Sequence, residues 1–184
     1  MKIIGLGNKK QVGKDTAAGF IKEYYNDQGL SVEVTSFATP LYFICEYLYG
    51  WAGFKTKAYY DKNPRDKEKP LVIGKSPRQI LIDLSTAGVR TAVYNDTWID
   101  YMFKRPHEAD VLIITDVRFP NEAQAIHEHG GFIFKVSRPI DDTPDIADTA
   151  LDSDKGWWDF ALINNGTLKE FREHIFTIFA GANL

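Results

Sequence analysis

Apolar runs that suit β-strands alternate along the chain with amphipathic stretches that suit helices. Residues 2–6 form a short apolar run, and apolar side chains then recur at helical spacing over residues 14–28. Residues 31–37 alternate as a strand does. Residues 111–115 are almost continuously apolar, which is typical of a strand buried on both faces of a parallel sheet. This alternation predicts a doubly wound α/β domain with a mostly parallel sheet.

The same alternation continues to the end of the chain. A helix is predicted from residue 120 to about 130, a strand over 132–136 and a strand over 160–163. Thr167 and Glu170 have the spacing of a capping box and predict the start of a final amphipathic helix. Further helices are predicted over 40–49, 77–94 and 98–102, while residues 141–159 are acidic and irregular.

A basic segment separates the first half of this pattern from the second. Residues 53–76 carry seven Lys and Arg residues with little periodicity, which indicates either a substrate lid built from a loop or short helices, or a solvated charged loop. We therefore predict one domain over residues 1–184, with a helical insert over about 40–105 that binds the acceptor and supplies a lid.

Charge and cysteine content narrow the functional classes. The formal net charge of −3 is unlike that of proteins that coat nucleic-acid polymers, which are basic. Cys45 has no partner for an intrachain disulfide and suits a reducing compartment. No segment is apolar over the roughly 18 residues that cross a bilayer. We expect a cytoplasmic protein with small-molecule partners, and a homodimer stays open.

The first sixteen residues contain the most specific chemical signal. A strand ends at Gly7, and a loop then leads to Gly13 and Lys14 at the start of a helix. Loop and helix N–H groups in this order cradle phosphates, and the lysine ammonium reaches the terminal phosphates. We therefore predict a P-loop that binds a nucleoside triphosphate, with ATP as the expected donor.

The loop departs from the usual motif in three places. Asn8 occupies the first glycine position, and asparagine tolerates left-handed backbone angles. Asp15 follows the lysine where a hydroxyl is usual, with Thr16 one place later. Because Mg²⁺ prefers hard oxygen ligands, Asp15 and Thr16 are candidate metal ligands.

A second group of charged residues follows the apolar run 111–115. Asp116 comes directly after it and is a candidate Mg²⁺ ligand, because ligands of this fold lie at the carboxyl ends of strands. Arg118 has a guanidinium suited to phosphoryl oxygens. Glu122 lies about one helical turn further on and is expected to orient Arg118.

These motifs together resemble those of the bacteriophage deoxynucleoside monophosphate kinases. The stretches that carry the resemblance are residues 4–16, 76–81 and 114–122, and the similarity extends from residue 1 to about 139. Residues 162–168 are similar to the last strand-to-helix turn of small nucleotide kinases. The resemblance implies a three-layer P-loop fold and transfer of a phosphoryl group from ATP to a deoxynucleoside monophosphate, with Mg²⁺.

The resemblance also implies roles for individual residues. The expected catalytic residues are Lys14, Asp15, Asp116, Arg118 and Glu122. The expected ATP contacts are Gly7, Asn8, Val12, Gly13, Lys14, Asp15 and Thr16, with Arg138 added as a lid candidate. The expected acceptor contacts are Arg78, Gln79, Thr86, Trp98 and Arg118, although Trp98 suits a core position equally well.

Departures from the family pattern leave alternatives open. Val12, Ile82 and Ser85 stand where the family commonly has serine, glutamine and glycine. The alternatives are another small-acceptor P-loop kinase, of the dephospho-coenzyme A or phosphomevalonate type, and a nucleotide-binding module without transferase activity.

Overall fold

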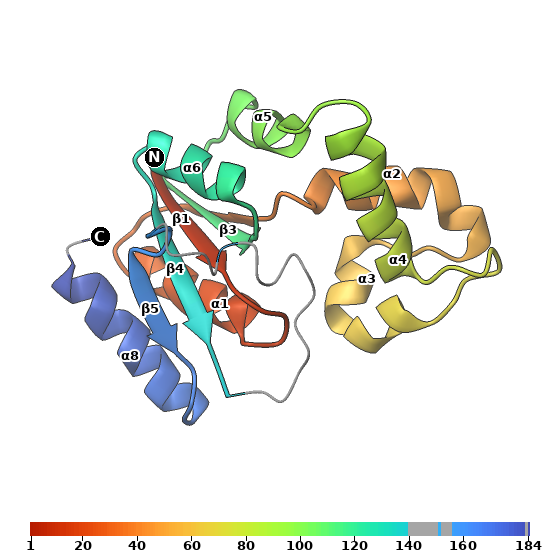
Figure 1. Ribbon diagram of the computed structural model, residues 1–184. Helices are drawn as coiled ribbons and strands as arrows, with labels where there is room; N and C mark the ends of the chain where they lie inside the picture. Colours follow the sequence, from red (N-terminus) through yellow and green to blue (C-terminus); the bar gives the residue numbers. More distant parts are fainter. Residues whose placement is uncertain (140–150, 152–155, 183) are drawn as a thin grey trace. The chain divides into compact units, whose positions relative to one another are not determined.

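The computed structural model describes residues 1–139, 151, 156–182 and 184. The chain divides into two compact units (Figure 1). Unit 1 comprises Met1–Ser36 and Pro106–Leu184, and unit 2 comprises Phe37–Arg105. Most of the acidic stretch 141–159 lies outside the described residues.

Unit 1 is built on a parallel sheet. The strands are β1 (Lys2–Gly7), β2 (Val32–Thr35), β3 (Val111–Val117), β4 (Phe132–Ser137) and β5 (Phe160–Ile163). Within the described residues they form one five-stranded sheet in the order β2-β3-β1-β4-β5, and each neighbouring pair is parallel. The predicted parallel α/β architecture is confirmed.

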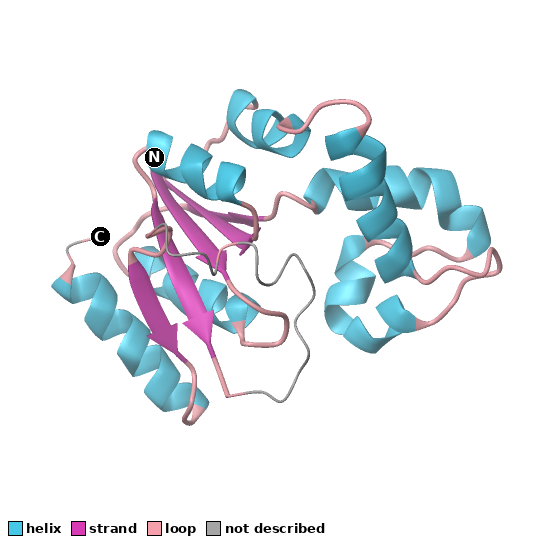
Figure 2. Ribbon diagram, viewed as in Figure 1, coloured by secondary structure: helices cyan, strands magenta, loops and turns pink. Residues whose placement is uncertain are grey.

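Helices cover both faces of this sheet and give three layers (Figure 2). On one face, α1 (Lys14–Asn26) and α8 (Leu168–Gly181) pack with Ile4 and Leu6 of β1 in a single apolar core. On the other face lies α6 (Pro120–Glu128), whose Ile126 Cδ1 would stand 2.8 Å from a Cβ added to Gly5. Side chains along β1 point alternately to the two faces of the sheet, so β1 contributes to the packing on both faces.

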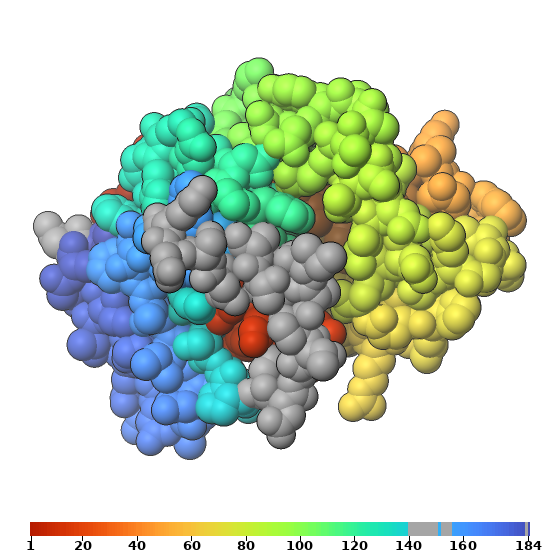
Figure 3. Space-filling view, viewed as in Figure 1, coloured from red at the N-terminus to blue at the C-terminus, as the bar shows by residue number. Residues whose placement is uncertain are grey.

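Strand β4 and the edge strand β5 continue the same core. Figure 3 shows their residues, in cyan and blue, together at the surface of unit 1. Inside, Phe134 of β4 stacks on Phe160 of β5 at a centroid distance of 4.9 Å, and on Phe179 of α8 at the same distance. The predicted capping box starts α8, because Thr167 Oγ1 accepts from Glu170 N and Glu170 Oε2 accepts from Thr167 N.

The topology determines where a ligand can lie. All strands run in the same direction, so the loops that follow β1, β3, β4 and β5 leave from one edge of the sheet. The chain passes from β1 to β2 on one side and from β3 over to β4 on the other, so β1 lies at the point where the winding reverses. In open α/β sheets, ligands bind at this point outside the carboxyl ends of the strands.

Unit 2 is helical. Its elements are α2 (Thr39–Tyr49), η1 (Gly50–Ala52), α3 (Lys57–Lys62), η2 (Pro64–Glu68), α4 (Pro77–Ile82), η3 (Asp83–Thr91) and α5 (Thr97–Lys104). The basic segment 53–76 thus contains two short helices. The helix predicted over 77–94 begins at Pro77 as expected but widens into a π-helix in η3.

Trp157 and Trp158, which precede β5, pack within unit 1. The indole of Trp157 stacks on His127 of α6, and the indole of Trp158 lies against the backbone of Gly7. Across the described residues no helix combines the length and apolar character that a membrane crossing requires.

Candidate active site

The loop between β1 and α1 has the backbone of an anion cradle. Asn8, Gln11 and Gly13 have φ angles of 105°, 61° and 98°, all in the left-handed region. The predicted tolerance of Asn8 for this conformation is confirmed. Because these left-handed residues are interspersed along the loop, the chain turns tightly between the end of β1 and the start of α1. Loops of this kind point their backbone N–H groups into one concavity.

Lys14 folds back over this loop. Its Nζ donates to the main-chain carbonyl oxygen of Asn8 at 2.9 Å and also to that of Lys9. The ammonium group is therefore held by loop carbonyls, above the strand end from which the loop departs. A cation held in this position adds positive charge to the concavity without occupying its N–H groups.

The first turn of α1 faces the same loop. Its N-cap is Gly13, which has no side chain to accept from the N–H groups of the turn. Those N–H groups and the helix dipole attract an anion. Asp15, in this first turn, is exposed and Thr16 is half-buried, so both oxygen-bearing side chains reach solvent at the start of the helix.

Two asparagines attach the loop to neighbouring strands. Asn8 Nδ2 donates to the Val136 carbonyl of β4 at 2.8 Å. Asn164, which follows β5, donates from Nδ2 to the Val12 carbonyl at 3.0 Å. A Cβ on Gly13 would lie 2.5 Å from this amide nitrogen. The loop shape is therefore fixed by three strands, and only glycine fits next to Asn164.

Val12 contributes to the site through its backbone. Its side chain is 1% exposed and belongs to the core between the sheet and α1, while its carbonyl accepts the bond from Asn164. The apolar residue at this position fills the core beneath the loop.

The carboxyl end of β3 brings a second charged group beside the loop. Val117 of β3 is paired in register with Gly7 of β1, so Asp116 and Arg118 flank the strand position opposite the start of the loop. Both side chains are half-buried. The sheet itself thus places a carboxylate and a guanidinium-bearing residue next to the phosphate loop.

Glu122 acts on the backbone of this segment. The residue is 2% exposed, and its Oε2 accepts from the N–H of Arg118 at 2.8 Å and from the N–H of Phe119 at 3.1 Å. The carboxylate therefore caps α6 and fixes the main chain at Arg118. We expected Glu122 to orient the arginine, and the bonds show that it holds the arginine backbone.

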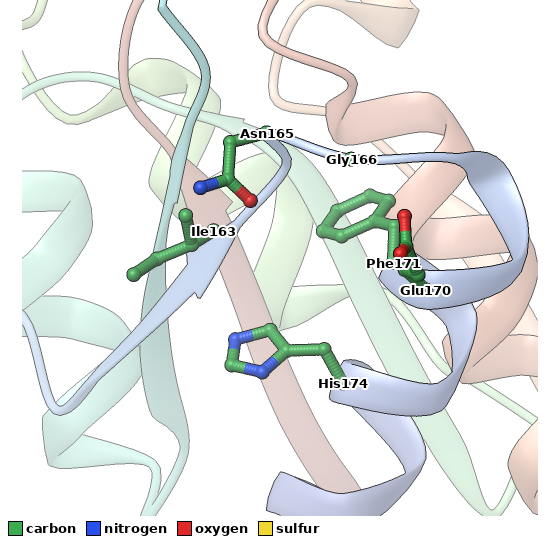
Figure 4. Close-up of a pocket in the computed structure, with 6 residues that line it drawn as sticks. All are labelled: Ile163, Asn165, Gly166, Glu170, Phe171 and His174. Carbon is green, nitrogen blue, oxygen red and sulfur yellow. The ribbon is translucent and has the colours of Figure 1, made fainter.

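A pocket opens next to the loop anchor. It has a volume of about 260 Å³ and lies between the end of β5 and the first turns of α8 (Figure 4). The lining residues are Ile163, Asn165, Gly166, Glu170, Phe171 and His174. His174 Nε2 is buried there without a hydrogen-bond partner. Bonds from the Thr167 N–H and hydroxyl lower the pKa of Glu170, so its carboxylate stays charged at the rim.

Sequence reasoning did not identify this pocket or the role of Asn164. The available signal was the Asn-Asn-Gly turn over residues 164–166, immediately after the predicted strand 160–163. An amide at the carboxyl end of a parallel strand is positioned to reach the loops of neighbouring strands.

The expected acceptor residues lie on unit 2. Arg78 of α4 forms an ion pair through Nε with Glu68, and the two side chains are 32% and 58% exposed. Gln79 and Thr86 are exposed, and Thr86 Oγ1 lies 3.4 Å from Ser85 Oγ in the π-helix η3. A π-helical turn inside a helix often marks a functional site.

Trp98 does not share this exposure. Its side chain is 5% exposed, and its Nε1 donates to the Ser85 carbonyl at 3.4 Å. We therefore assign Trp98 to the interior of unit 2. Arg138, which follows β4 in unit 1, is exposed at the carboxyl edge of the sheet.

A relative from a giant virus decides the family. A protein of Acanthamoeba polyphaga mimivirus named "Putative deoxynucleotide monophosphate kinase" is 30% identical over 201 residues, covering 100% of this chain and 98% of the relative. The chain belongs to the deoxynucleotide monophosphate kinase family. No protein-family model matches it.

One solved structure agrees with this deoxynucleotide monophosphate kinase family at the level of fold. Shikimate kinase from Aquifex aeolicus has a TM-score of 0.50 at 11% identity, covering 98% of both chains. Dephospho-CoA kinase from Campylobacter jejuni has a TM-score of 0.43 at 14% identity over both full chains. The first comparison shows the P-loop kinase fold, and the viral relative shows the family.

Proposed function

We propose that this chain transfers the γ-phosphoryl group of ATP to a deoxynucleoside monophosphate, giving the diphosphate. The observation that carries the proposal is the left-handed loop closed by Lys14 beside Asp116 and Arg118, in a member of the deoxynucleotide monophosphate kinase family. The acceptor phosphate is already an anionic nucleophile, so catalysis by positioning and electrostatic stabilisation suffices.

The donor phosphates fit the loop between β1 and α1. The expected ATP contacts Gly7, Asn8, Gly13 and Thr16 line or flank the loop, and Val12 takes part through its main chain. On phosphate binding, Lys14 exchanges its carbonyl partners for phosphate oxygens. That exchange costs little, because each bond from the ammonium to a neutral carbonyl oxygen is replaced by one to an anionic phosphate oxygen, in which both partners are charged.

The residues around the loop fit Mg²⁺ in the way nucleotide kinases use it. Asp15, Thr16 and Asp116 offer hard oxygen ligands, and Mg²⁺ at such sites is held by one or two carboxylates together with substrate phosphates. When bound, Mg²⁺ neutralises charge on the phosphates.

Three arginines are proposed to contact the phosphates of the two substrates. Arg118, whose backbone Glu122 fixes, is proposed to contact the phosphoryl group during transfer. Arg78 is the proposed acceptor contact, with Gln79 and Thr86 beside it on α4 and η3. Arg138 is proposed to cover the donor phosphates, which would exclude water from the transfer.

The pocket between β5 and α8 suits the donor base. It adjoins Asn164, which touches the phosphate loop, and it combines the aromatic rings of Phe171 and His174 with the amide of Asn165. Flat apolar walls with a few polar atoms are what a base requires. We further propose small nucleotides as the partners and, because the relative is viral, the host cytoplasm as the location.

The deciding experiment is an ADP-release assay with Mg·ATP and a panel of acceptors: deoxynucleoside and ribonucleoside monophosphates, dephospho-coenzyme A and phosphomevalonate. Turnover with deoxynucleoside monophosphates that Lys14→Ala abolishes is the expected result. Turnover with another acceptor class would reassign the kinase, and ATP binding without turnover would favour a nucleotide-binding module.

A further inference from the structure

The helix that carries the proposed acceptor contacts changes its winding part-way along. It begins as α4 at Pro77 and continues without a break as the π-helix η3, from Asp83 to Thr91 (Figure 1). An α-helix holds 3.6 residues per turn, whereas each hydrogen bond of a π-helix spans one residue more. One α turn and one π turn together therefore hold about eight residues, which is the separation of Arg78 and Thr86.

This winding brings three side chains into one row. Ile82 lies midway between Arg78 and Thr86, four residues from each, and we name the three the acceptor row. In a purely α-helical segment Thr86 would be rotated by about 80° away from Arg78. The row reaches solvent, because Ile82 is 49% exposed, Thr86 is exposed and the Arg78 side chain is 32% exposed. Ile80, about half a turn away, is buried in unit 2.

The order of the acceptor row matches the order of groups in a nucleoside monophosphate. A guanidinium such as that of Arg78 binds a phosphate, and the hydroxyl of Thr86 suits the polar edge of a base. The sugar lies between these two groups, as Ile82 lies between Arg78 and Thr86. Successive helical turns rise by about 5.4 Å, so neighbouring side chains of the row suit neighbouring groups of one nucleotide.

The exposure of the two arginines of this helix gives the row a direction. Arg90, one turn beyond Thr86, is 9% exposed, and its Nη1 lies 3.5 Å from the Asn95 carbonyl oxygen. Arg90 therefore belongs to the interior of unit 2. Arg78 is held by an exposed ion pair with Glu68, which an acceptor phosphate can replace. The phosphate end of the row is therefore Arg78.

The polar groups next to Ile82 already have partners. Ser85 Oγ donates to the Ile82 carbonyl oxygen at 3.2 Å, and Asp83 forms an ion pair with Lys75 at 2.6 Å. A sugar hydroxyl brought against the Ile82 side chain would lose water and would have to compete with these bonds. A sugar that has hydrogen in place of this hydroxyl meets no such cost.

We propose that Ile82 packs against the C2′ side of the acceptor sugar and makes this chain select deoxyribonucleotides over ribonucleotides. A single exposed isoleucine is ordinary, but its place between Arg78 and Thr86 gives this one a role. This inference rests on the proposed function, since it requires a nucleoside monophosphate as the acceptor. An apolar pocket disfavours an added hydroxyl by about 10²-fold at most, and one apolar wall should contribute about 10-fold.

The test compares a deoxynucleoside monophosphate with the ribonucleotide of the same base, by kcat/KM at saturating Mg·ATP. We expect the wild type to prefer the deoxynucleotide by about 10–10²-fold. Ile82→Thr keeps the β-branched shape and adds a hydroxyl that can bond the 2′-hydroxyl. It should raise kcat/KM for the ribonucleotide about 10-fold, mainly through KM, and change the deoxynucleotide little.

Two controls isolate the added hydroxyl. Ile82→Val keeps an apolar side chain at the same position and should retain the wild-type preference. Ile73→Thr makes the same chemical change at another isoleucine of unit 2, which is 38% exposed, and should also retain it. If Ile82→Thr folds poorly, Ile82→Gln supplies a polar group with good helix propensity and should shift the preference in the same direction.

An acceptor with fluorine at C2′ separates desolvation from size. Fluorine takes the position of the hydroxyl but donates no hydrogen bond, so it loses little when water leaves. The wild type should use the 2′-fluoro acceptor nearly as well as the deoxynucleotide. A 2′-fluoro acceptor as poor as the ribonucleotide would mean exclusion by size and would contradict the role given to Ile82.

The remaining outcomes distinguish this inference from the proposed function. Equal use of deoxynucleotide and ribonucleotide by an active wild type would overturn the inference and leave the kinase assignment intact. So would a preference that Ile82→Thr and Ile73→Thr change equally, or a parallel loss for both acceptors in Ile82→Thr, which would place Ile82 away from C2′. Absence of turnover with every monophosphate would overturn the proposed function, and the inference with it.

Discussion

The two units hold their candidate functional residues in different ways. In unit 1, the phosphate loop is tied by Asn8 to β4 and by Asn164 to β5, and Glu122 fixes the chain at Arg118. In unit 2, Arg78 is held by one exposed ion pair with Glu68. Exposed ion pairs contribute about 0–1 kcal/mol, whereas buried hydrogen-bonded groups cost more to disturb.

This difference corresponds to the two proposed tasks. Stabilising developing charge on a phosphoryl group requires donors that are in place before the reaction. Holding one of several acceptors requires contacts that can exchange partners at low cost, as Arg78 can by leaving Glu68. We therefore propose a donor site in unit 1, held by these hydrogen bonds, and an acceptor site in unit 2 whose arginine can exchange partners, and the following variants test this contrast.

The largest effect is expected at Lys14. Lys14→Ala removes the cation that crosses the loop, and turnover should fall by about 10²–10³-fold or more, as it does when a preorganised charge-stabilising donor is lost. The measurement is the rate of ADP release with a deoxynucleoside monophosphate. Lys10→Ala, in the same loop, is the control and should keep most of the turnover. Comparable losses in both variants would indicate general loop damage.

Gly13 is expected to affect both stability and donor binding. A Cβ at Gly13 would lie 2.5 Å from Asn164 Nδ2 at a φ of 98°, so Gly13→Ala should cost about 1–3 kcal/mol and weaken ATP binding. Gly29 has a similar φ of 79°, and a Cβ added there would meet no heavy atom within 4 Å. Gly29→Ala therefore isolates the cost of backbone strain. Urea unfolding and ATP titration measure the two effects. Equal losses of stability in Gly13→Ala and Gly29→Ala would mean that the contact with Asn164 does not affect stability.

Two substitutions of Glu122, to Ala and to Gln, separate the effect of its charge from the effect of its hydrogen bonds. Glu122→Ala leaves the N–H groups of Arg118 and Phe119 without this acceptor and should cost about 1–3 kcal/mol of stability, together with turnover. Glu122→Gln keeps an acceptor oxygen and should recover most of both. Unfolding curves and initial rates test this pair, and a Gln variant as inactive as the Ala variant would assign Glu122 a direct charge role.

The smallest effect on stability is expected at Glu68. Glu68→Ala releases Arg78 from an exposed ion pair, so stability should change by less than about 1 kcal/mol. The KM for the acceptor should fall, because Arg78 no longer has to leave a partner, while the KM for ATP should stay constant. Two-substrate kinetics test this. An altered KM for ATP would contradict the division of tasks between the units.

The fold and the phosphate loop could be predicted from sequence because their signals are local. Strands 2–6 and 111–115 are apolar runs, and Asn8 through Thr16 form a contiguous motif. The bond between Asn164 and Val12 joins residues 152 positions apart, and no local pattern predicts such a pair. The apolar content of α2 likewise predicted a helix, but periodicity cannot tell a face that unit 2 buries from one that stays in water.

The most direct test of the proposed division is a separate binding measurement for each substrate by isothermal titration calorimetry. We expect Lys14→Ala to lose affinity for a Mg²⁺-bound, non-hydrolysable ATP analogue and to keep affinity for a deoxynucleoside monophosphate. Arg78→Ala should show the reverse. If both variants lose the same ligand, or if Arg78→Ala binds the monophosphate as the wild type does, then the donor and the acceptor are not divided between the two units.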